Sequence, residues 1–110
     1  MVGEREWSQG LPIAVRVVPG DGGACTVTVA VTGEVDLATA AVLGAALEQA
    51  EATRSGRVDV DLAGVSFLGL AGVHTLGDAR RRLEAAGREL RLVRVPRSAA
   101  RVLDLSGWGR

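Results

Sequence analysis

The sequence predicts an α/β domain, in which a small mixed β-sheet of about four strands carries helices mainly on one face. Stretches whose apolar residues recur at every second position alternate with stretches whose apolar residues recur at helical spacing. The strand-like stretches also place polar residues on one of their faces, as expected for a sheet that is covered on one side only. Strands separated by a helix should pair in parallel through right-handed crossovers, which leaves successive helices on the same face.

The first part of the chain is typical of a β-hairpin. Residues 1–11 are charged and polar and are expected to form a flexible leader, followed by a single domain over residues 12–110. Leu11–Val18 and Cys25–Thr32 alternate in polarity as strands do. Pro19–Gly23 lies between them, is rich in turn residues and is too short for a helical crossover, so it should close a hairpin.

The first helix is expected after a break in the strand pattern at Gly33–Asp36. Asp36 is suited to cap this helix, because its carboxylate can accept hydrogen bonds from the free backbone N–H groups. Arg54–Arg57 should end the helix, and Val58–Leu62 should form the third strand. The apolar stripe of the helix consists of Ala40, Leu43, Leu47 and Ala50.

A corner at Gly69–Gly72 is expected to lead from the third strand into the second helix. Such a corner places backbone N–H groups at the edge of a sheet, where ligands and partners commonly bind. Its four residues carry no hydroxyl, carboxylate, amine or thiol. The helix should cover residues 70–86 and end at Gly87. Its inward stripe consists of Val73, Leu76, Ala79, Leu83 and Ala86.

The last part of the chain predicts one more strand and one more helix. Leu90 and Leu92 mark a fourth strand that ends before Pro96. Ser98 can cap the final helix, because serine is among the preferred residues at that position. Gly107 should stop the helix.

Charge argues against nucleic acid or an anionic membrane as the main partner. The 13 arginines are balanced by 13 acidic residues, and both kinds of partner are held chiefly by excess positive charge. The basic run at Arg80–Arg82 is no exception. The pairs Asp78–Arg82 and Arg80–Glu84 have the i,i+4 spacing of ion pairs on a solvated helix face.

Three features favour a cytoplasmic protein that does not insert into a membrane. The single cysteine cannot form an internal disulfide, which fits a reducing compartment. Residues 1–11 lack the apolar centre of a signal peptide. The longest nearly apolar run, Leu37–Leu47, is well short of the roughly 18 residues that a membrane span needs.

No group of side chains predicts an enzyme. Cys25 and His74 are the only nucleophile–base candidates, and about seven strand steps should separate them by roughly 20 Å. A lone His74 does not form a metal site. Gly64, Gly69 and Gly72 match neither the dinucleotide-binding pattern nor the P-loop, and the chain has no lysine for the latter. We expect no catalytic residue, no metal and no cofactor.

Three carboxylates are expected to share one edge of the sheet. Glu34 and Asp36 follow the second strand, and Asp61 lies near the end of the third. Paired carboxylates can serve acid–base chemistry or bind a divalent cation. The other interpretation is one helix cap and two solvated charges.

Several motifs, in order, resemble the STAS domain family and in particular its bacterial anti-sigma factor antagonists. They are Gly33-Glu34-Val35-Asp36, then Val60–Leu68 with Gly72-Val73, and finally Ala100–Gly107. The resemblance covers roughly Ile13 to Trp108. It implies a STAS-like fold and a regulatory protein that binds an anti-sigma factor, often a serine kinase, and so releases a sigma factor.

The family's usual switch is a serine at the start of the second helix, within the run Asp-Ser-Ser-Gly. The matching positions here are Gly69–Gly72, so Leu70 stands at the phosphoacceptor position. The resemblance therefore implies a module that cannot be phosphorylated there. A phosphate would otherwise add about −1.5 to −2 charges at the docking surface and oppose binding. Ser66 and Thr75 are the nearby hydroxyls at which a relocated switch would be sought.

The resemblance implies a docking surface for an anti-sigma factor or a serine-kinase-like protein, and a homodimer is also compatible with it. Leu70 either joins Leu68 in a small apolar surface or folds back onto Val73. The alternatives are a ligand-binding or accessory STAS module of a transporter or sensory complex, and a degenerate structural subunit. The expected partner-binding residues are Glu34, Asp36, Gly69, Leu70, Ala71, Gly72 and His74.

Overall fold

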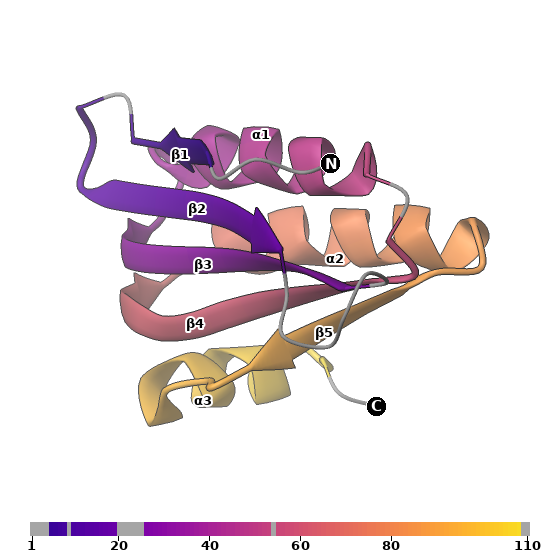
Figure 1. Cartoon of the computed structure of the whole chain (residues 1–110). Helices are drawn as coiled ribbons and strands as arrows, with labels where there is room; N and C mark the ends of the chain where they lie inside the picture. The colour runs from indigo at the N-terminus through magenta and orange to yellow at the C-terminus, as the bar shows by residue number, and fades with distance from the viewer. Residues whose placement is uncertain (1–4, 9, 20–25, 54, 109–110) are drawn as a thin grey trace.

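A computed structural model describes residues 5–8, 10–19, 26–53 and 55–108 of the chain. These residues form one five-stranded sheet and three helices (Figure 1). Residues 20–23 of the predicted turn and Cys25 lie outside the described residues. The elements are β1 (Arg5–Trp7), β2 (Ile13–Pro19), β3 (Thr26–Val35), α1 (Ala40–Glu51), β4 (Arg57–Leu68), α2 (Leu70–Ala85), β5 (Glu89–Val93) and α3 (Arg97–Leu105).

The strands lie in the sheet in the order in which they occur in the chain. β1, β2 and β3 pair antiparallel, whereas β3, β4 and β5 pair in parallel. The crossover helices α1 and α2 lie side by side on one face of the sheet (Figure 1), and α3 contacts β4 and α2. The predicted mixed sheet with helices mainly on one face is confirmed.

The sheet has one strand more than expected, because β1 lies inside the segment predicted to be a flexible leader. Arg5 pairs with Val17 and Trp7 with Val15. Trp7 is half-buried and packs against the core. A strand of three residues is too short to show an alternating pattern, so only its pairing with β2 and the burial of Trp7 reveal it.

One apolar core fills the space between the sheet and the helices. The inward residues of β2, β3 and β4 alternate as predicted, with Val17, Val29 and Val60 fully buried. The predicted stripes of α1 and α2 are buried or half-buried, except for Ala86. Ala86 follows the end of α2 and is exposed, and Gly87 reverses the chain there at φ +73°.

Two predicted helix caps are wrong. Gly33–Asp36 does not break the second strand, because β3 continues to Val35 and Gly33 pairs with β2 at φ +102°. α1 therefore starts later, with Thr39 as its N-cap residue in place of Asp36. α3 starts directly after a proline, so Ser98 lies inside the helix and does not cap it. A glycine within a strand pattern can mark either a break or a close approach of two backbones.

β4 is longer than predicted and runs past Leu62 to Leu68. Two irregularities in its pairing with β3 each give β4 one extra residue. An extra residue exchanges the inward and outward faces of the strand that follows it. Leu62, Val65 and Leu68 are therefore all buried at a spacing of three, and Phe67 faces solvent.

Ion pairs on α2 both neutralise its basic run and attach it to α1. Arg80 pairs with Glu84 at 3.1 Å, as predicted. The predicted pair between Asp78 and Arg82 is wrong, because Asp78 pairs with Arg81 instead. Arg82 instead reaches Glu51 of α1, with two nitrogen–oxygen distances of 2.8 Å. This fork-shaped pair joins the two crossover helices.

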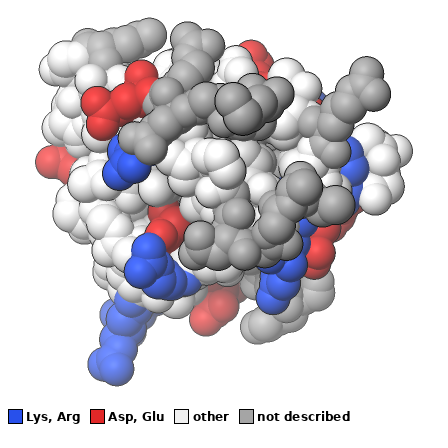
Figure 2. Space-filling view, in the orientation of Figure 1, with Lys and Arg blue, Asp and Glu red and all other residues white. Residues whose placement is uncertain are grey.

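Asp61 forms an ion pair on the sheet face opposite α1 and α2. Its Oδ1 accepts the Ala63 N–H at 2.9 Å, and its Oδ2 accepts the Arg94 Nε–H at 3.1 Å. Burial by itself raises the pKa of Asp61, but the hydrogen bonds from Arg94 and Ala63 and the charge of Arg94 together bring the pKa below its usual 3.8. In the view of Figure 2, the described acidic and basic side chains are interspersed, without a large patch of one sign.

Asp61 should make stability depend on pH in acid. Its pKa is lowered by folding, so the stabilisation is complete above the unfolded pKa of 3.8 and is lost as pH falls through the folded pKa. We expect Asp61→Asn to weaken the dependence of the unfolding free energy on pH below about pH 4. Urea unfolding of the wild type and of Asp61→Asn at several pH values measures this dependence. Parallel pH curves for the two proteins would contradict the assignment.

Candidate functional site

The candidate site lies where the ends of β3 and β4 meet the start of α2; we refer to residues 33–37 and 66–72 as the rim. Val35 pairs with Leu68, and the Gly69 N–H donates to the Val35 carbonyl at 2.8 Å. Gly69 is the N-cap residue of α2 in an extended conformation, and no side chain caps the helix. The two segments predicted to meet at one edge of the sheet therefore lie side by side.

Gly72 allows the first turn of α2 to pack closely on both strands. A Cβ at this position would lie 2.5 Å from Val35 Cγ1 and 2.8 Å from Leu68 Cδ1, and both of these side chains are buried. Such distances are shorter than van der Waals contact. Gly72 is itself buried and Ala71 is half-buried, so these predicted site residues shape the rim more than they present side chains to a partner.

Asp36 and Thr39 hold the loop after β3 through reciprocal hydrogen bonds. The Thr39 N–H donates to Asp36 Oδ1 at 3.1 Å, and the Asp36 N–H donates to Thr39 Oγ1 at 2.9 Å. The Thr39 hydroxyl also lies 2.8 Å from the Glu34 carbonyl, to which it donates. Asp36 is half-buried, whereas the Glu34 side chain is exposed. Asp36 thus stabilises the rim, and Glu34 is the free acidic side chain on it.

Thr39→Val should destabilise the protein, although it preserves the shape of the side chain. Thr39 is fully buried, so the change leaves the Asp36 N–H and the Glu34 carbonyl without this partner. We expect the unfolding free energy, measured by chemical denaturation, to fall by about 2 kcal/mol. Thr32→Val, at an exposed position on β3, should change it by less than about 0.5 kcal/mol. Equal losses in the two variants would contradict the role of Thr39.

Three large apolar side chains of the rim face solvent. Leu37 is 87% exposed, Leu70 61% and Phe67 52%. Leu70 is therefore not folded into the core, and Leu68, which was considered as its apolar neighbour, is buried. The ring of Phe67 lies against Gly69, since a Cβ there would be 3.2 Å from a ring carbon. Clustered exposed apolar groups are typical of a protein-interaction surface.

Sequence reasoning missed Leu37 and Phe67 as members of the rim. Strand alternation does not assign Phe67 to the solvent face, because the extra residue at Ser66 exchanges the faces just before it. Leu37 was counted within an apolar run leading into the first helix, whereas it precedes that helix. The signal that could have found them is the presence of large apolar residues beside the expected corner and at the expected start of the first helix.

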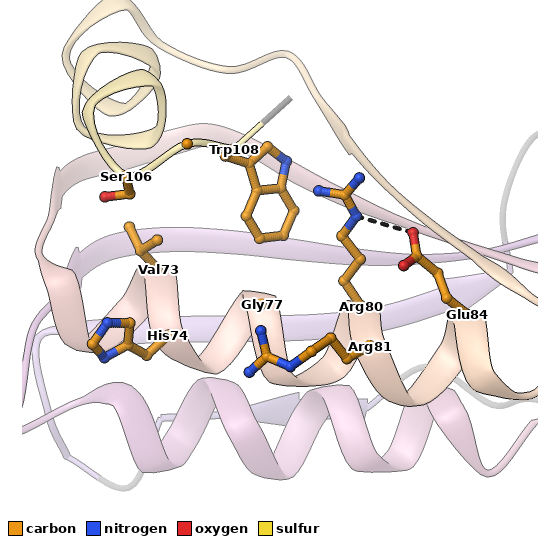
Figure 3. Close-up of a pocket in the computed structure, with 9 residues that line it drawn as sticks. Val73, His74, Gly77, Arg80, Arg81, Glu84, Ser106 and Trp108 are labelled. Carbon is orange, nitrogen blue, oxygen red and sulfur yellow. Dashed lines mark hydrogen bonds and ion pairs between the residues drawn. The ribbon is translucent and has the colours of Figure 1, made fainter. Parts of the chain in front are cut away.

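Two other predicted residues lie elsewhere. Asp61 pairs with Ala30, well before the end of β4, so the expected grouping of three carboxylates at one edge is wrong for Asp61. His74 is exposed on α2, one turn into the helix, beside a hollow that also contains Trp108 (Figure 3). Among the residues that the structure describes, no group of three or more His, Cys, Asp or Glu could hold a metal.

The topology and the rim define a STAS-like α/β domain. A family model described as "Mlab, STAS domain" matches residues 21–110, which is most of the chain. The chain therefore belongs to the STAS domain family. No curated protein matches it significantly. No helix among the described residues is both long and apolar enough to cross a membrane.

Several solved structures are similar to this chain. An anti-sigma factor antagonist from Mycobacterium paratuberculosis is 27% identical, with a TM-score of 0.77 over 86% of this chain and 78% of that one. The unphosphorylated antagonist SpoIIAA is 21% identical, with a TM-score of 0.67 over 86% and 82% of the two chains. A STAS-domain antagonist from Rhodobacter sphaeroides is 20% identical, with a TM-score of 0.65 over 86% and 98%. The last two show a shared fold.

Proposed function

We propose that this protein is a non-enzymatic regulatory module of the anti-sigma factor antagonist type, which binds an anti-sigma factor or a serine-kinase-like protein through the rim. The observation that carries the proposal is the exposed Leu70 at the start of α2. The sequence resemblance aligns this residue with the family's phosphoacceptor serine. The 27% identity to a solved antagonist supports the same functional class.

The rim offers a partner an apolar centre with an acidic border. Leu37, Phe67 and Leu70 supply exposed apolar area, and Glu34 is an exposed carboxylate beside them. Glu34 lies opposite Phe67 in the register between β3 and β4, so charge and apolar area meet on one surface. Apolar centres with polar margins are the common anatomy of protein interfaces. His74 extends this surface along α2.

Binding at this rim would not be reversed by phosphorylation of residue 70. Leucine has no hydroxyl, and neither Gly69 nor Ala71 supplies one. The fraction of the partner that is bound would therefore depend on its concentration and affinity alone, without a covalent switch at this position.

Leu70→Glu should abolish most of the binding to a cognate anti-sigma factor. A carboxylate in the apolar centre must be desolvated on docking, so we expect at least about a 30-fold loss of affinity by isothermal titration calorimetry. Ala85→Glu is the control, because it adds the same charge at the exposed far end of α2, about 22 Å along the helix. Wild-type affinity in both Leu70→Glu and Glu34→Arg would refute the rim as the docking surface.

A permanent accessory subunit of a transporter or sensory complex is the second candidate. The missing hydroxyl at residue 70 favours it, because a constitutive interface needs no phosphorylation switch. Affinity purification from the native cell would separate the two candidates. A stable complex with membrane-transport subunits would support the accessory role, and capture of an anti-sigma factor would support the antagonist role. A homodimer through the rim would instead double the mass measured by light scattering.

A further inference from the structure

A hollow of about 320 Å³ lies between α2 and the end of α3, beside the rim (Figure 3). Its volume is at the lower end of the range of small-molecule sites, about 300–1,000 Å³. Gly77 of α2 leaves bare backbone at its floor, and Trp108 stands above it. Arg81 lies on the other side of Gly77 and turns back toward it (Figure 3).

Trp108 forms a fixed wall of this hollow. α3 ends at Leu105, and Gly107 follows it at φ +82°. The Trp108 N–H donates to the Leu103 carbonyl at 2.9 Å, which directs the chain back toward α2. The Arg80 guanidinium carbon lies 5.0 Å from the centre of the indole ring, within cation–π range. Arg80 is held in turn by Glu84 at 3.1 Å. The indole is therefore held in place before any ligand binds.

Arg81 presents an unused edge of its guanidinium to the hollow. Its Nη2 pairs with Asp78, whereas its Nη1 lies over Gly77. A Cβ at Gly77 would lie 3.6 Å from Arg81 Nη1 and 3.8 Å from Trp108 Cζ3. Both are ordinary van der Waals distances, so a group one atom thick fits between the guanidinium and the indole.

We propose that this hollow binds a small planar aromatic carboxylate, with its ring against Trp108 over Gly77 and its carboxylate on Arg81. Arg80 is paired with Glu84, and Arg81 uses its Nη2 for Asp78, so the Nη1 edge of Arg81 is the donor that faces the ligand. His74 also lines the hollow. A planar guanidinium matches a carboxylate through paired hydrogen bonds, and an indole face stacks on an aromatic ring. The hollow adjoins the docking surface at His74, but the proposed ligand binding does not depend on the docking function of the rim.

The proposal is tested by titrating 2-naphthoate into the ¹⁵N-labelled full chain and following backbone amide shifts by NMR. We expect saturable shifts at residues 73–81 and 106–108, with a dissociation constant on the order of 1 mM, as ligand efficiency allows for so small a molecule. The uncharged 2-naphthalenemethanol and the non-aromatic cyclohexanecarboxylate should each bind at least about tenfold more weakly. Equal binding of all three, or no saturable shift at these residues, would overturn the proposal.

Two variants locate the site. Gly77→Ala should weaken 2-naphthoate binding at least about tenfold, because its methyl group fills the space between Arg81 and Trp108. The same change should keep or raise the melting temperature, since alanine favours a helix over glycine. Arg81→Gln should also weaken binding about tenfold, and the exposed Arg97→Gln on α3 should not. Wild-type affinity in folded Gly77→Ala and Arg81→Gln would overturn the assignment.

Discussion

Gly33→Ala is expected to lower the free energy of unfolding by about 3 kcal/mol or more. Gly33 has φ +102°, a region that side chains other than glycine rarely adopt. A Cβ there would also lie 2.4 Å from the Pro12 carbonyl oxygen and 3.1 Å from Ile13 Cα. These are backbone atoms of the first residue of β2 and of the residue before it, and the Glu34 N–H donates to the same Pro12 carbonyl at 2.8 Å. Relief of the clash would therefore disturb the pairing of β2 with β3.

The matched control for this prediction is Gly87→Ala, measured by the same urea denaturation. Gly87 has a comparable φ of +73°, but no atom lies within 4 Å of its Cβ position. It isolates the cost of the backbone conformation, about 1 kcal/mol, from the cost of the clash. If Gly33→Ala lost no more stability than Gly87→Ala, the backbone at the start of β2 would shift to relieve the clash at little cost, and the prediction would be wrong.

Leu70→Ser is expected to create a phosphorylation site where the wild type has none. This expectation rests on the proposed antagonist function and on a partner with serine-kinase activity. Residue 70 is exposed on the first turn of α2, so a hydroxyl there would be accessible. Incubation with the kinase partner and ATP should add one phosphate to the variant, detected by mass spectrometry. The phosphorylated form should bind its partner at least about 30-fold more weakly, through charge repulsion and desolvation.

The wild type and Leu70→Ala should remain unmodified under the same conditions. Thr75 is half-buried, and its hydroxyl donates to the Ala71 carbonyl at 3.0 Å, so it is a poor acceptor. Ser66 is exposed at the irregularity of β4 beside Phe67. Phosphate on Ser66 of the wild type would show that the switch has moved within the rim and would contradict a module without a switch.

The fold was largely predictable because its main elements carry local periodic patterns. The stripe that contains Leu43 and Leu47 on α1 and the one that contains Leu76 and Leu83 on α2 follow the helical period, and their burial is confirmed. The parallel pairing followed from the alternation of strands and helices along the chain. β1 escaped prediction, because three residues do not display a period and the strand depends on its contact with β2.

The candidate site was predictable in position but not in detail. The residues around Glu34 and Leu70 could be placed at one edge of the sheet, because both follow strands that pair in parallel. The exposure of Phe67 and the separation of Asp61 from Glu34 follow from the length and irregular pairing of β4. These properties belong to the pair of strands, so one strand's sequence does not display them.

Sequence patterns alone established the helix stripes, the parallel crossovers and the absence of a hydroxyl from residue 70, because each depends on nearby residues or on residue identity. The tertiary structure showed that Asp36 accepts a hydrogen bond from Thr39 and that Gly33 lies against the Pro12 carbonyl. It also showed that Arg81 and Trp108 lie on opposite sides of Gly77. The approaches of Gly33 to Pro12 and of Gly77 to Trp108 join segments that are far apart in the chain, so only the packing of the core sets these distances.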